Sequence, residues 1–236
     1  MSKFEKLFLA RQYDDIIRMR RGGREPGKEK QPSIDSTLAY EYAETLCAAG
    51  RADEALAWCQ VMIERSKHPS THEYLYAGLA MLLRGDVTGA ERYWKQAATK
   101  RLYTFNAGYE GWFAIFLGKI CFGLRDIDVA TPIKKLQLTW NMVNYPKPFL
   151  ISQLIMKQQS LEHLEATALE QFRPNDFEVI WRLRLYNSFL EFQDGQISAQ
   201  TLSRRVSSLA REPVSYVFFD LVLARVFGKL RKVWQK

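Results

Sequence analysis

Apolar residues recur every three to four positions along most of the chain, and no segment shows the alternation of a β-strand. This spacing predicts helices near residues 4–19 and over 35–49, 52–67, 71–84, 87–100, 109–122, 149–171, 175–193, 197–211 and 214–233. Glycine and proline residues crowd positions 22–32 and exclude a helix there. We therefore expect an all-α fold of roughly 9–11 helices.

Two neighbouring helix pairs repeat one residue pattern around glycines that lie 35 positions apart, Gly50 and Gly85. A small residue stands seven positions before each glycine and an alanine five positions after it, where two antiparallel helices come closest. A period of about 34 residues is typical of helical arrays. The matching residues are Tyr42, Ala43, Leu46, Ala55, Cys59 and Met62 around Gly50, and Ala77, Gly78, Met81, Ala90, Trp94 and Ala97 around Gly85.

The repeated unit resembles the tetratricopeptide repeat (TPR) family, whose small residues, mid-unit glycine and later alanine match residues 39–62 and 74–97. The first unit departs from the family pattern, because Cys59 stands where a large aromatic residue is common. The resemblance implies a right-handed superhelix of antiparallel helix pairs. Residues 1–145 would form the TPR-like repeat region, with a flexible basic loop at 20–34. Residues 146–236 would form a C-terminal helical region packed on the repeats.

The resemblance also implies a concave face lined by the first helix of each pair. The inward positions would be Tyr40, Glu44, Leu75, Leu79, Leu82, Phe113 and Leu117. Members of the family that clamp the carboxylates of chaperone tails need Lys, Arg and Asn on this face, and none stands at these positions. An apolar face of this kind must be covered, either by a partner helix or by the chain's own C-terminal helices.

The net charge of +8 is concentrated in two segments. Residues 18–30 hold six basic residues against two acidic ones, and residues 225–236 hold five basic residues and no acidic one. The first segment is either a solvated, flexible excursion or a cationic arm for an acidic protein, anionic lipid or nucleic-acid phosphates. Because Tyr13 is the one aromatic residue nearby, an acidic protein suits it better than stacked RNA bases. The residues expected to steer a partner are Arg18, Arg20, Arg21, Arg24, Lys229, Arg231 and Lys232.

Aromatic residues are dense between positions 93 and 116. Such rings at helical spacing usually belong to a core, although Trp and Tyr are also enriched at interfaces. Phe105 and Tyr109, near the expected inter-repeat loop, are the candidates for partner contact. The apolar segment 214–227 is expected to pack into the body or across a homodimer interface, rather than to lie on a membrane surface.

No catalytic or metal-binding constellation emerges from the sequence. Pro69 separates His68 from His72 and prevents the helical spacing that two metal ligands need. No phosphate loop or nucleophile elbow is present. The cysteines lack metal spacing and are most simply core residues: Cys47, Cys59 and Cys121. We therefore expect a protein that is not an enzyme, with no catalytic residues, no metal and no cofactor.

The N-terminus lacks the apolar core of a signal peptide, and the odd number of cysteines favours a reducing compartment, so we expect the cytoplasm. The expected function is non-catalytic protein–protein interaction by an adaptor, a chaperone or a toxin-neutralising immunity-type protein. It would use the apolar and aromatic concave face, with the basic segments steering association. The alternative is a nucleic-acid-associated helical protein that uses the basic loop and C-terminal tail for phosphate contacts. An enzyme with an unrecognised acid–base pair in residues 120–212 is the third hypothesis.

Overall fold

A computed structural model describes residues 2–20, 37–66, 69, 71–99, 108–122, 128–137, 146–172, 177–214 and 219–234. Every regular element within these residues is a helix, which confirms the all-α class. The described part of the chain has thirteen helices, more than the expected 9–11. They are α1 (Lys3–Leu9), α2 (Tyr13–Arg20), α3 (Thr37–Ala49), α4 (Ala52–Arg65), α5 (Thr71–Leu83), α6 (Val87–Thr99), α7 (Gly108–Phe122), α8 (Ala130–Gln137), α9 (Pro146–Ile155), α10 (Leu161–Gln171), α11 (Phe177–Gln193), α12 (Ala199–Leu209) and α13 (Phe219–Trp234).

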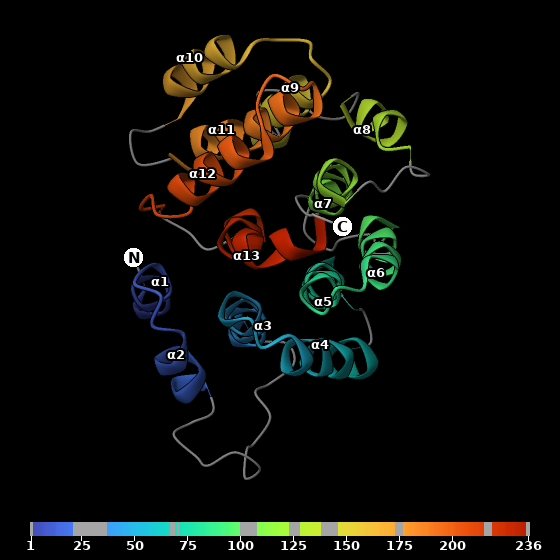
Figure 1. The fold of residues 1–236 in the computed structure, drawn as a ribbon, viewed down its shortest axis with the longest axis vertical. Coiled ribbons are helices and arrows are strands. Elements are labelled where there is room, and N and C mark those ends of the chain that lie inside the picture. Colours follow the sequence, from blue (N-terminus) through green and yellow to red (C-terminus); the bar gives the residue numbers. More distant parts are fainter. Residues whose placement is uncertain are drawn as a thin grey trace.

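The last helix lies at the centre of the molecule. Figure 1 shows α1 to α12 following one another around α13. Successive helices pack as neighbours, and α3 also packs on α5, as α5 does on α7. Helix α13 packs on α3, α5, α7 and α12, three of which are distant in sequence. The core is therefore completed only when the C-terminal helix is in place.

Within the described residues, three helices end on a glycine in the left-handed backbone region. The φ angles are 80° for Gly50 after α3, 83° for Gly85 after α5 and 72° for Gly195 after α11. In the first of these, Gly50 N–H donates to the Cys47 carbonyl at 3.0 Å and Arg51 N–H donates to the Leu46 carbonyl at 2.9 Å. A side chain is disfavoured in this conformation, which ends the helix and reverses the chain. The repeated glycines therefore act as helix stops.

Helices α1 and α9 end with the same pair of backbone hydrogen bonds, but the residue in the left-handed conformation is a cation instead of a glycine. Arg11 has a φ of 59° and Lys157 a φ of 53°. Lys157 N–H donates to the Leu154 carbonyl at 2.9 Å, and the next N–H donates five residues back at the same distance. The expected single helix over 149–171 is therefore wrong, because this turn divides it into α9 and α10. No glycine marks the break in the sequence.

The second helices of two pairs are held to the first by an indole hydrogen bond. Trp58 Nε1 donates to the Ala39 carbonyl at 3.0 Å, and Trp94 Nε1 donates to the Leu75 carbonyl at 3.1 Å. Both bonds span 19 residues, so Trp58 does in α4 what Trp94 does in α6. The aromatic residue expected at position 59 thus lies one residue earlier.

Close packing explains the small residue before the second glycine. A Cβ atom on Gly78 would lie 2.3 Å from Nε1 of the buried Trp94.

Helix α8 lies where the sequence predicts no helix, and Asp128 Oδ1 caps it by accepting the Thr131 N–H at 3.1 Å. Of the helices described, none is both long and apolar enough to span a membrane.

Candidate functional site

The expected concave face is occupied by the chain itself. Leu75 and Leu79 are fully buried, and Phe113 and Leu117 are 1% exposed. Phe219 of α13 packs edge-on against Tyr76 and Trp94, with ring centroids 5.7 Å and 6.4 Å away. A partner has no access to this face while α13 is in place. We therefore correct the expected docking surface: these side chains form the core beneath α13.

The two polar positions of that face tie α3 to α5. Glu44 is buried and accepts a hydrogen bond from the Tyr76 hydroxyl at 2.6 Å. Tyr40 is half-buried, and its hydroxyl donates to Glu73 Oε1 at 3.2 Å. Each bond joins the first helices of adjacent pairs. Both residues therefore support the array from inside rather than meeting a ligand.

Two of the expected steering residues contact other parts of the chain. Arg20 pairs with Glu41 of α3 and lies 5.8 Å above the Phe4 ring, and burial lowers its pKa. Lys229 Nζ donates to the Ala48 carbonyl at 2.8 Å, at the end of α3. Arg18 differs, because its side chain is exposed and its ion pair, at 3.5 Å, is with Asp15 on the same helix. Other candidates lie outside the described residues (Phe105, Arg21 and Arg24) or have side chains outside them (Tyr109, Arg231 and Lys232).

The expected dimer helix is also covered. The apolar residues of α13 from Phe219 to Leu230 are buried within the chain, with Leu221, Val222 and Val226 fully so. These apolar residues are therefore part of the core of a single chain, and a homodimer would have to use another surface.

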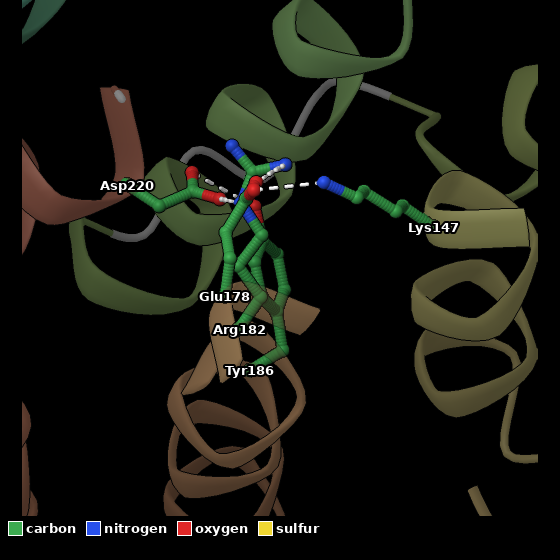
Figure 2. Close-up of polar contacts among 5 residues, drawn as sticks. All are labelled: Lys147, Glu178, Arg182, Tyr186 and Asp220. Carbon is green, nitrogen blue, oxygen red and sulfur yellow. Dashed lines mark hydrogen bonds and ion pairs between the residues drawn. The ribbon is translucent and has the colours of Figure 1, made fainter. Parts of the chain in front are cut away.

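A buried network of charges joins α9, α11 and α13, as Figure 2 shows. Arg182 lies between two carboxylates: its Nη1 is 3.3 Å from Glu178 Oε1 and its Nε is 3.1 Å from Asp220 Oδ2. Lys147 of α9 reaches Glu178 Oε2 at 2.9 Å. The Tyr186 hydroxyl donates to Asp220 Oδ1 at 3.2 Å. Arg182 thus connects α11 to α13, and Glu178 connects α11 to α9.

The network is electrically matched. Burial alone would raise the pKa of Glu178, but Arg182 and Lys147 outweigh it and the pKa is lowered. The Arg182 side chain is 3% exposed and that of Asp220 is 7% exposed. A buried charge is tolerated when opposite charges lie against it in this way. Since the residues that contact each other across helices are 31 to 38 positions apart, no local sequence pattern indicates the network.

A pocket of about 270 Å³ opens between α7, α8 and the ends of α9 and α11. Its floor is apolar: Phe116, Ile120, Val129, Ile133, Ile155 and Leu190. Its rim is charged, with Lys119 and Asp128 from the α7–α8 side and Lys157 and Asp194 from the α9–α11 side. None of the five network residues lines it.

The rim charges are arranged in opposite-sign pairs. Lys157 Nζ lies 2.6 Å from Asp194 Oδ2. Asp128 accepts hydrogen bonds from Thr131, which lower its pKa, and the charge of Lys119 lowers the pKa further. The pocket therefore offers an apolar floor under a polar rim of no net charge. This suits an apolar group with a polar surround better than a highly charged ligand.

Metal-ligating chemistry is not assembled in the part of the chain that the structure describes: no three His, Cys, Asp or Glu side chains gather there. Burial raises the pKa values of the Cys47 and Cys59 thiols, so both stay protonated at neutral pH and are poor nucleophiles. Comparison of this chain with family models, with curated proteins and with solved structures finds no match.

Proposed function

We propose that this chain is a TPR-like helical-repeat protein that binds a protein partner without catalysing a reaction. The glycine stops after α3 and α5 and the two equivalent indole bonds support the repeat assignment. Adaptor, chaperone and toxin-neutralising roles all require this kind of rigid binding scaffold. Which of these three roles the protein has would depend on the partner that it binds.

Recognition would use the pocket between α7, α8, α9 and α11, because α13 fills the concave face. This pocket is the observation that carries the proposal. At about 270 Å³ it lies just below the range of about 300–1,000 Å³ that holds drug-sized ligands and cofactors. It is large enough for one bulky apolar side chain. An apolar anchor inside a polar rim is the usual arrangement of a protein–protein hot spot.

The nucleic-acid alternative has less support. One of its expected phosphate contacts, Arg20, already pairs with Glu41 of α3 inside the fold. A channel for single-stranded nucleic acid usually combines free cations with exposed stacking rings. Large aromatic side chains with high exposure are scarce in the described residues, where Phe177 is the one exposed aromatic ring.

A peptide-library selection tests the pocket directly. Ala130 lines the mouth, is exposed and begins α8, so Ala130→Trp should block the pocket at little cost in stability. Ala199 is an exposed alanine that begins α12, so Ala199→Trp is the matched control. We expect selected peptides to share a large apolar residue, to bind the control as they bind the unaltered chain, and to bind Ala130→Trp at least about tenfold more weakly. Selected peptides that bind Ala130→Trp with unchanged affinity would place recognition elsewhere.

A further inference from the structure

Three cations converge where α13 crosses the ends of α1 and α3. Arg225 and Lys229 are four residues apart on α13 and share one face of that helix. Arg225 Nη1 approaches the Leu9 carbonyl at 3.4 Å, and Lys229 Nζ donates to the Ala48 carbonyl at 2.8 Å. Arg11 follows Leu9 by two residues, in the turn that ends α1.

Arg11 is close enough to repel both cations of α13. Burial lowers the pKa of Lys229, and the charge of Arg11 lowers it further. Burial also lowers the pKa of Arg225, where a hydrogen bond with the Tyr13 hydroxyl opposes the shift and Arg11 adds to it. Within the described residues, none of the three cations pairs with a carboxylate. The site is therefore positive and uncompensated.

Helix ends explain only part of this cluster. Cations favour the carbonyl-rich ends of helices, which accounts for Arg225 at α1 and Lys229 at α3. Arg11 makes no such contact with the described residues, and it stands in the left-handed conformation that glycine takes after α3, α5 and α11. Arg225 Nε is buried and has no hydrogen-bond partner within the described residues, while the Phe8 ring lies 5.7 Å from its guanidinium carbon. A buried N–H without an acceptor raises the free energy of the folded state, and a bound acceptor would lower it.

We propose that Arg11, Arg225 and Lys229 bind an oxyanion of the phosphate class at the junction of α1, α3 and α13. A phosphate monoester carries about 1.5 to 2 negative charges at neutral pH, so it compensates three cations better than a single carboxylate does. A guanidinium matches the geometry of two phosphate oxygens, and an ammonium adds a compact charge beside it. The site is distinct from the pocket and does not depend on the function proposed for it.

Thermal unfolding and calorimetry with inorganic phosphate test this site, with sodium chloride at equal ionic strength as the reference. We expect phosphate to raise the melting temperature saturably and above the chloride reference, and acetate to do so less. Glycerol phosphate is the second probe. Tighter binding than inorganic phosphate would identify an organic phosphate ester as the ligand, and equal or weaker binding would identify the free anion.

Two substitutions at Arg11 separate charge from backbone conformation. Arg11→Gln removes the charge and keeps a side chain in the left-handed turn, whereas Arg11→Gly removes both the charge and the side chain. We expect each to weaken phosphate binding about tenfold. Without phosphate both should raise the melting temperature by removing the charge repulsion, and Arg11→Gly should raise it further by relieving the left-handed conformation. Arg211→Gln removes an exposed cation after α12 and should bind phosphate as the unaltered chain does. A chain that shows no saturable response to phosphate, or an Arg11→Gln variant that responds fully, would overturn the proposal.

Discussion

The two sides of α13 connect their helices with different chemistry. On the α3–α5 side, one hydroxyl–carboxylate bond of 2.6 Å joins Tyr76 to Glu44 in the buried layer. On the α9–α11 side, a chain of charges runs from Lys147 through α11 to Asp220 (Figure 2). The geometry is related, since Tyr186 of α11 also donates its hydroxyl to a buried acid on another helix, Asp220 of α13. The difference is the presence of a buried cation.

That difference sets how each side responds to change. Removing a neutral donor leaves one acceptor short of a hydrogen bond, which costs about 1–3 kcal/mol. Removing a buried cation leaves two carboxylates buried without compensation, which costs more. The α9–α11 side should therefore be the more sensitive to single substitutions and to pH.

Arg182→Met is expected to have the largest effect. It leaves Glu178 and Asp220 buried without their shared partner, so we expect the free energy of unfolding to fall by about 3–5 kcal/mol. Chemical denaturation measures this loss. Arg184→Met is the control on the same helix, because its pair with Glu165 is half exposed and worth about 0–1 kcal/mol. Equal losses for the two variants would show that the network contributes no more than a surface pair.

The response to acid should also distinguish the two sides. The pKa of Glu178 lies below its ordinary value of 4.5, so its charge contributes stability above that pH and the contribution is lost as the pH falls below it. We expect Glu178→Gln to be less stable at neutral pH and to lose less on acidification than the unaltered chain. Denaturation midpoints from neutral pH to about pH 3 test this. Parallel curves for the two proteins would contradict it.

Tyr76→Phe probes the opposite side of α13. Loss of its bond to Glu44 should lower the free energy of unfolding by about 1–2 kcal/mol, less than the loss for Arg182→Met. A double-mutant cycle with Glu44→Gln isolates the bond itself. A loss as large as that of Arg182→Met would remove the contrast between the two sides.

The helix stops should show the smallest effects, with opposite signs on the two sides. A Cβ on Gly85 would meet nothing within 4 Å, so Gly85→Ala tests the backbone alone and should cost about 1 kcal/mol. Lys157→Gly relieves the same strain after α9 and should add about 0.5–1 kcal/mol. Both Lys157 forms are compared in an Asp194→Ala background, which removes the ion pair from the difference. A destabilising Lys157→Gly would mean that the lysine stem contributes packing at the pocket rim.

The ends of α3 and α5 were predictable because glycine marks them. Gly50 and Gly85 end α3 and α5, and the small Gly78 lies directly against Trp94. After α9 the same turn is made by Lys157, which carries no such mark, so α9 and α10 were predicted as one helix. Trp58 and Trp94 donate to equivalent carbonyls, but their sequence separations from Gly50 and Gly85 differ by one residue. Counting from the glycine therefore does not align the two indoles.

The candidate sites were less predictable than the helices. Leu75, Leu79, Phe113 and Leu117 were expected to face a groove, and their apolar character fits a groove and a core equally well. Lys229 appeared as one of several basic residues near the C-terminus, and only its contact with the Ala48 carbonyl separates it from the rest. The pocket draws its walls from four helices that are distant in sequence, so no spacing indicates it.

The sequence by itself determined the helical class, the stops at Gly50 and Gly85, and the need to cover an apolar face. These follow from local physics, namely the helical period, the freedom of glycine at positive φ and the cost of exposing apolar surface. Only the tertiary structure decided that α13 covers that face, that Glu178 and Arg182 link α9, α11 and α13, and that Arg11 lies near Arg225 and Lys229. Such contacts join residues between about 30 and more than 200 positions apart, and packing rather than local spacing selects them.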